Sequence, residues 1–122
     1  MIGSLMMCVS VVVLLFGMLV GIAMGIKQDF TLSPAHAHLN LVGGVLLFLF
    51  GLYYRLFPAV GNTLLARLQG WLHIVGGIVF PAGVAMVVVY GESYIAAPIV
   101  GSLIVVAAMA LFTIIVFRTS RA

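Results

Sequence analysis

The sequence predicts an all-α integral membrane protein, a bundle of four spanning helices that forms a single domain over residues 1–122. Of these residues, 66% are hydrophobic and only 6% are charged, whereas water-soluble domains carry roughly a quarter charged residues. A chain this apolar has too little polar surface to cover a soluble fold. The composition therefore excludes a soluble enzyme and a nucleic-acid-binding module. A spanning helix takes about 20 residues, so the length allows four of them.

Short polar breaks divide the chain into four apolar runs. The breaks are Lys27–Asp29, Pro58–Thr63 and Gly91–Ser93. Because backbone groups in lipid must be satisfied within their own segment, each run is expected to be a helix. We expect Ser33 to cap the second helix and Pro34 to be its first residue. The predicted spans are about residues 4–26, 34–57, 65–90 and 94–117.

The basic residues predict the orientation in the membrane. Arg55 and Arg67 flank the second connection, and Arg118 and Arg121 follow the last span. Since Lys and Arg concentrate on the cytoplasmic side, we expect both termini in the cytoplasm and the protein in the cytoplasmic membrane. Aromatic residues near the predicted span ends should form interfacial belts, namely Tyr53, Tyr54, Trp71, Tyr90 and Tyr94.

Small residues and one proline predict how the helices pack. Gly17, Gly21 and Gly25 lie four residues apart on the first helix, which lets another helix approach closely. This motif does not distinguish a contact within the chain from a contact between subunits. Pro81 lies inside the third span, and we expect it to kink that helix.

Two histidines on the second helix are the strongest functional signal. Ionisable residues inside a membrane are costly, and His36 and His38 stand only two positions apart. Residues two apart on a helix point about 200° apart, so they cannot chelate one metal ion together. This geometry suits two planar cofactors, one on each side of the helix. We expect Asn40, one turn beyond His36, to orient that imidazole, and Gly43 to leave room for a flat macrocycle.

The third histidine is predicted to lie at another depth. His73 should sit roughly 20 Å along the membrane normal from His38, so these two residues should not share an iron. We expect His73 to be structural and paired with Gln69. A haem on His36 or His38 then needs its second axial ligand from another copy of the chain, which predicts a symmetric homo-oligomer.

The stretch Ala35–Pro58, which contains Ala-His36-Ala-His38-Leu-Asn40, resembles the tenth membrane helix of the haem-copper oxidase and nitric oxide reductase catalytic subunit. The segment Gly70–Ile78 is similar to the next helix of that subunit. In this family one histidine of the pair ligates the low-spin haem and the other the high-spin haem. Its twelve helices form three four-helix arcs with approximate threefold symmetry. The resemblance implies ligation of haem b iron by His36 and His38, and a homotrimer of four-helix chains.

Other parts of the family pattern are missing. The ligands of the copper ion, the redox tyrosine and the arginine pair at the haem propionates have no counterpart, and Lys27 is the only cation near the predicted site. The missing copper ligands argue against oxygen or nitric oxide reduction. Iron with two axial histidines has both axial positions filled, so we expect electron transfer; an open axial position would instead allow nitric oxide or oxygen to bind. Whether the chain is an enzyme stays open. We expect a quinone or another membrane redox subunit to exchange electrons with it.

Two alternatives come from other classes of function. Soft ligands lie near the predicted inner face and deeper in the first helix, which is compatible with copper or other metal handling. They are Met1, Met6, Met7 and Cys8 near that face, and Met18 and Met24 deeper. The chain is also compatible with a non-catalytic accessory or assembly subunit of a respiratory complex, in which the histidines lie at the interface only.

Overall fold

A computed structural model describes residues 1–121, and it confirms an all-helical architecture with four helices long and apolar enough to cross a membrane. The second span is composite, because a π-helix separates two α-helical parts. Short helices form two of the three connections. The elements are α1 (Ile2–Lys27), α2 (Ser33–His38), the π-helix η1 (Leu39–Leu46), α3 (Leu47–Leu56), α4 (Pro58–Gly61), α5 (Leu64–Tyr90), the 3₁₀ turn η2 (Glu92–Tyr94) and α6 (Ala96–Arg121).

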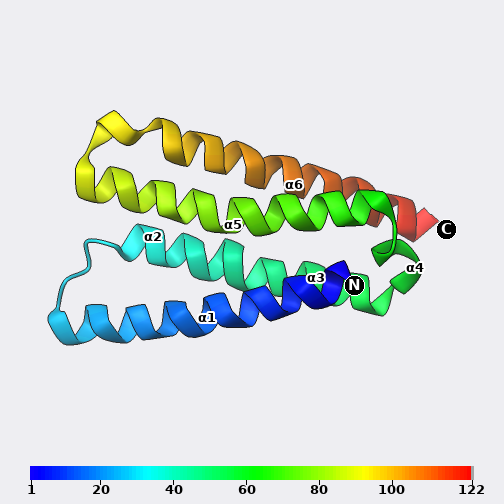
Figure 1. The fold of residues 1–122 in the computed structure, drawn as a ribbon, viewed down its shortest axis with the longest axis horizontal. Helices are drawn as coiled ribbons and strands as arrows, with labels where there is room; N and C mark the ends of the chain where they lie inside the picture. Colours follow the sequence, from blue (N-terminus) through cyan, green and yellow to red (C-terminus); the bar gives the residue numbers. More distant parts are fainter. Residues whose placement is uncertain (122) are drawn as a thin grey trace.

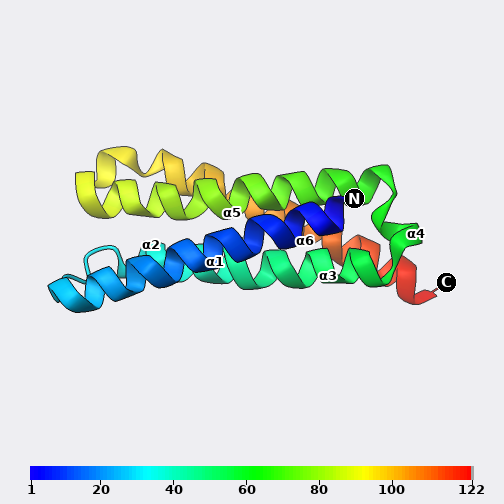
Figure 2. The same cartoon turned by 60° about the horizontal axis from the view of Figure 1, so that its bottom comes forward.

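The four spans run antiparallel to their neighbours, in the order α1, the α2–η1–α3 span, α5 and α6 (Figure 1). Both termini lie at one end of the bundle together with α4, and we call this the terminal end; the other two connections form the loop end. Figure 2 shows α1 crossing the second span at an angle. An even number of spans places both termini on the same side of a membrane. That this side is the cytoplasm stays a prediction.

The packed core lies in the half of the bundle near the terminal end. Phe50 of α3 stacks on Phe112 of α6, with ring centroids 3.9 Å apart. Met6 of α1 is fully buried in this core, whereas Cys8 is exposed. The core residues are Ile2, Met6, Leu47, Phe50, Tyr54, Ala66, Ile74, Phe112 and Ile115. Most other large apolar side chains point outward, as expected of a protein whose surroundings are lipid.

Two of the three α1 glycines make close contacts within the chain. Gly17 lies directly against the side chain of Asn40, and a Cβ added at Gly21 would lie 3.2 Å from the His36 ring. Gly25 has no neighbour within 4 Å of such an atom. The small-residue row therefore admits the polar side chains of the second span between two helices.

Two local predictions are corrected. The second span begins at Ser33 and its N-cap is Leu32, because the Leu32 carbonyl accepts the first helical hydrogen bond, from the N–H of His36. Tyr54 belongs to the core and not to an interfacial belt: it is 2% exposed, and its hydroxyl donates to Oε1 of Gln69 at 2.8 Å. Its position on the face of α3 that packs on α5, rather than its closeness to the helix end, decides its environment.

Asp29, in the first connection, is held at the loop end. Its carboxylate accepts hydrogen bonds from the Thr31 hydroxyl at 2.6 Å and from the Thr31 N–H at 3.1 Å. These two bonds favour the charged form and lower the pKa of the Asp29 carboxyl below its ordinary value. Asp29 therefore carries a negative charge at this end of the bundle at neutral pH.

Candidate functional site

The π-helix η1 begins directly after His38. A π-helix has wider turns than an α-helix, is rare, and often occurs at functional sites. Here it runs for eight residues, Leu39–Leu46, and includes the glycine pair Gly43 and Gly44. We had expected one continuous α-helix, because the apolar pattern of this run carries no signal that separates the two helix types.

Gly43 brings η1 into backbone contact with α5. A Cβ added at Gly43 would lie 2.7 Å from the carbonyl oxygen of Gly77, which is too close for any side chain. That oxygen lacks its usual α-helical donor, because the residue four positions on is Pro81, which has no N–H. Helix α5 nevertheless runs unbroken through Pro81. The Gly77 carbonyl of α5 thus lies against Gly43, and only glycine, which has no Cβ, lets η1 come this close.

His73 ties η1 to α5 with a hydrogen bond. The side chain is 1% exposed, and its Nε2–H donates to the carbonyl of Val42 at 2.8 Å. The edge of its ring meets Phe50, with ring centroids 4.9 Å apart. Nδ1 is buried and has no hydrogen-bond partner among residues 1–121. The predicted pairing with Gln69 is wrong, because the Gln69 amide accepts from Tyr54 and donates to the Ala108 carbonyl.

Replacing His73 by leucine should lower the free energy of unfolding by about 1 kcal/mol, since one hydrogen bond between membrane helices is worth about 0.6–1.7 kcal/mol. His73→Gln keeps an N–H donor and should lose less. Unfolding in mixed detergent micelles, followed by circular dichroism, measures both. Equal stability of the leucine variant and the original protein would show that the bond to Val42 does not stabilise the fold.

His36 points from α2 toward α1 and contacts Asn40, as predicted. The Asn40 amide nitrogen lies 3.2 Å from Nε2 of His36 and 3.5 Å from Nδ1. Because an amide nitrogen only donates, it donates to the lone pair of a His36 ring nitrogen, and the tautomer decides which of the two nitrogens carries that lone pair. Oδ1 of Asn40 is buried against Gly17 without a donor in the described part of the chain. A metal on the accepting nitrogen would have to take this lone pair from Asn40.

His38 points from α2 toward α5, in an arrangement typical of a metal ligand. Its Nδ1 lies 2.7 Å from the carbonyl oxygen of Pro34, so Nδ1 carries the proton and donates it. Metal-ligating histidines donate their second ring N–H to a carbonyl or carboxylate in this way. The Nε2 lone pair makes no hydrogen bond within residues 1–121, and the ring meets Phe80 edge-on with centroids 4.8 Å apart. We did not predict from the sequence that the Pro34 carbonyl accepts from His38. The spacing offers a signal, because the carbonyl four residues before a helical histidine lies near its ring.

The two imidazoles flank an outward-facing strip of the second span. His36 and His38 lie about 100° to either side of Ala37 on the helix. Ala37 is exposed, and so are Leu41 and Val45, which continue the strip along η1. We call these three residues the exposed strip. A helix packed along the exposed strip would have His36 on one side and His38 on the other.

His73 lies nearer to the pair than predicted, but not within reach of a shared iron. Gly43 and Gly77 mark a common level, because their backbones touch. His38 is five residues beyond Gly43 toward the loop end, and His73 is four residues before Gly77 toward the terminal end. An α-helix rises 1.5 Å per residue and the wider π-helix rises less, so nine residues separate the two levels by at most roughly 13 Å, not 20 Å. One chain therefore cannot supply both axial ligands of one haem from these two histidines.

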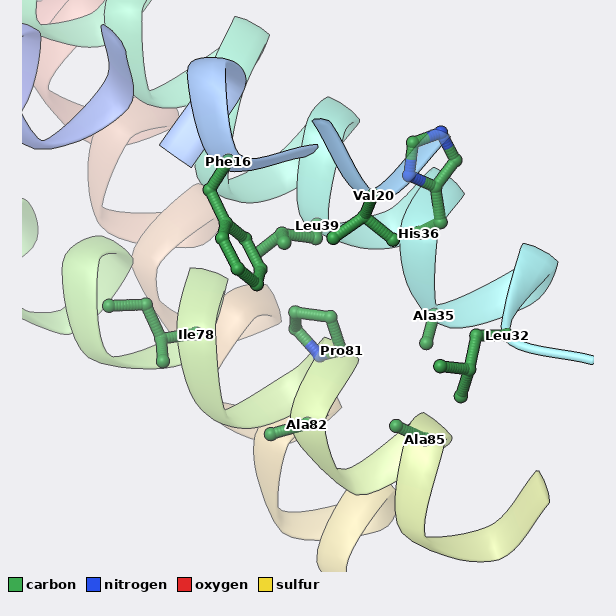
Figure 3. A pocket seen from close by; sticks show the side chains of 10 residues that line it. All are labelled: Phe16, Val20, Leu32, Ala35, His36, Leu39, Ile78, Pro81, Ala82 and Ala85. Carbon is green, nitrogen blue, oxygen red and sulfur yellow. The ribbon is translucent and has the colours of Figure 1, made fainter. Parts of the chain in front are cut away.

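An apolar cavity of about 300 Å³ lies beside the pair, between α1, α2 and α5. Figure 3 shows the His36 ring at its edge, directed away from the apolar side chains, so the cavity itself is not a ligand site for that imidazole. It is lined by Phe16, Val20, Leu32, Ala35, His36, Leu39, Ile78, Pro81, Ala82 and Ala85.

The comparisons with known proteins found no protein-family model, no curated protein and no solved structure that matches this chain. Within the part of the chain that the structure describes, no three His, Cys, Asp or Glu side chains gather around a common point. The candidate site therefore consists of His36, His38, Asn40 and the η1 segment with Gly43.

Proposed function

We propose that this chain is a small membrane haem protein that binds haem b between second spans of a symmetric homo-oligomer, most simply a trimer, and transfers electrons. The observation that carries the proposal is the state of His38. Its Nδ1–H is fixed on the Pro34 carbonyl, which leaves the Nε2 lone pair for a metal.

The second axial ligand is proposed to come from a sister chain. His36 and His38 leave the helix on opposite edges of the exposed strip, so each chain presents one imidazole to each side. Cyclic symmetry places His36 of one subunit and His38 of the next at similar heights, since they differ by only two residues along the helix. A trimer has three such contacts for three chains, which gives about one haem per chain.

Asn40 is proposed to hold the His36 ring in place for ligation. In the chain by itself, the amide nitrogen donates to the lone pair of a His36 ring nitrogen, which keeps the imidazole oriented and that lone pair satisfied inside the membrane. A haem iron on the same nitrogen would have to displace the amide. In the single chain Gly43 contacts Gly77. That Gly43 also leaves room for the haem macrocycle stays a proposal.

The haem would supply a one-electron iron couple, and the protein residues hold and shield it. Two histidines fill both axial positions, so the proposed role is electron transfer and not gas reduction. We propose that the protein resides in the cytoplasmic membrane with the terminal end inside. The proposed histidine pair lies on a helix long and apolar enough to span a membrane, so a quinone or another membrane redox subunit is the proposed exchange partner.

The absorption spectrum of detergent-purified protein from haem-replete cells tests the proposal. We expect a Soret band, a reduced-minus-oxidised difference typical of bis-histidine b-type haem, and about one iron per chain. A colourless preparation that contains copper would favour metal handling by the methionines and Cys8. A colourless preparation without metal would favour an accessory or assembly subunit. Either of these two results contradicts haem binding.

A further inference from the structure

A groove with an apolar floor and a cationic rim lies at the terminal end of the bundle, far from the histidine pair. Its volume is about 310 Å³. Ile115 of α6 forms the floor and is 3% exposed. The groove lies between α4, the start of α5 and the end of α6, and it is lined by Ala59, Val60, Thr63, Leu65, Ile115, Arg118 and Thr119.

Charge is distributed unevenly between the two ends of the molecule. All four arginines lie at the terminal end, whereas both acidic side chains, Asp29 and Glu92, lie in the connections at the loop end. The groove thus lies in a region rich in positive charge, and none of its lining residues is acidic. The electrostatic preference of this end is for anions.

The polar groups on the rim leave Arg118 as the donor side chain for an anion. The Thr63 hydroxyl donates to the Val60 carbonyl at 2.7 Å, and the Thr119 hydroxyl donates to the Ile115 carbonyl at 2.8 Å. Both hydroxyl protons are therefore used within the chain. The Arg118 side chain is exposed and lines the groove. A guanidinium presents several N–H donors in a geometry that suits phosphate oxygens.

We propose that this groove binds an anionic phospholipid, with its phosphate on Arg118 and an acyl chain over Val60, Leu65 and Ile115. A free phosphate would leave the apolar floor uncovered, whereas a lipid satisfies both halves of the groove. Interfacial arginines near anionic headgroups each add about 1 kcal/mol. This inference does not depend on the proposed haem function, because the groove shares no residue with the histidine pair.

Lipid titration with matched arginine variants tests it. Purified protein in a neutral detergent is titrated with phosphatidylglycerol or phosphatidylcholine, and bound lipid is counted by native mass spectrometry. We expect phosphatidylglycerol to bind more tightly, and Arg118→Gln to weaken that binding about fivefold. Arg121→Gln removes an equal charge that does not line the groove, and it should change binding much less. Equal binding of the two lipids, or equal losses in both variants, would overturn the proposal.

A second variant tests the apolar half without changing charge. Val60→Trp should fill the groove and weaken phosphatidylglycerol binding while all four arginines remain. Inorganic phosphate alone should not compete at millimolar concentration, because it cannot cover the floor. Competition by phosphate as effective as that of the lipid would show an anion site and not a lipid site, and unchanged binding by Val60→Trp would also contradict the assignment.

Discussion

Alanine at position 38 is expected to remove haem from the protein while the bundle remains folded. His38 is half-buried, and its Nε2 makes no bond within the described chain, so the fold loses only the Nδ1 bond to Pro34 and the ring contact with Phe80. The proposed iron site loses an axial ligand. Because loss of even a supporting partner costs about 10–100-fold in metal affinity, haem per chain should fall about tenfold or more.

Pyridine haemochrome analysis of the purified variant measures this change, and circular dichroism checks the fold. His36→Ala should show the same loss, because it removes the other ligand. His73→Gln is the matched control: it changes the remaining histidine but leaves the pair intact, so haem should be retained. Retention of haem in His38→Ala, or its loss in His73→Gln alone, would contradict the assignment of ligands.

Gly43→Ala is expected to have the largest effect on the packing of the second span. The new Cβ would lie 2.7 Å from the Gly77 carbonyl oxygen. The backbone fixes the position of a Cβ, and the oxygen is itself a backbone atom, so no side-chain rotation can relieve this contact. The two helices must separate, which strains the His73 bond to the neighbouring Val42 carbonyl. Overpacking of this kind costs about 1–3 kcal/mol. Unfolding in mixed micelles should show a loss in this range.

Gly25→Ala is the control for this experiment, since nothing lies within 4 Å of a Cβ at that position. It adds the same methyl group to another membrane helix and should leave stability unchanged. If both alanine variants lost the same stability, the effect would come from glycine replacement in general. If Gly43→Ala were as stable as the original protein, the close contact between η1 and α5 would be refuted.

The helical architecture could be predicted from the sequence because lipid imposes few solutions. Four apolar runs with polar breaks leave only helices, and the observed bounds differ from the predicted ones by a few residues at each end. The contact of Asn40 with His36 was also predictable, since residues four apart share a helix face.

The tertiary partners could not be predicted in the same way. Whether Gln69 meets His73 or Tyr54 depends on how α5 is rotated against α3 and α6, and an almost uniformly apolar sequence carries little information about that rotation. The π-helix is a second example. Within it Gly43 meets the Gly77 carbonyl on another helix, and no pattern within residues 39–46 reveals this pairing.

The central claim is that each haem is held by two different chains, and mixed oligomers test it most directly. His36→Ala and His38→Ala chains are co-expressed with different tags, and oligomers that contain both are isolated by tandem affinity. Every mixed trimer has one contact in three where an intact His36 meets an intact His38, so we predict about one third of the original haem. Each variant alone should bind almost none. Mixed oligomers without haem, beside an original protein that binds it, would contradict ligation between subunits.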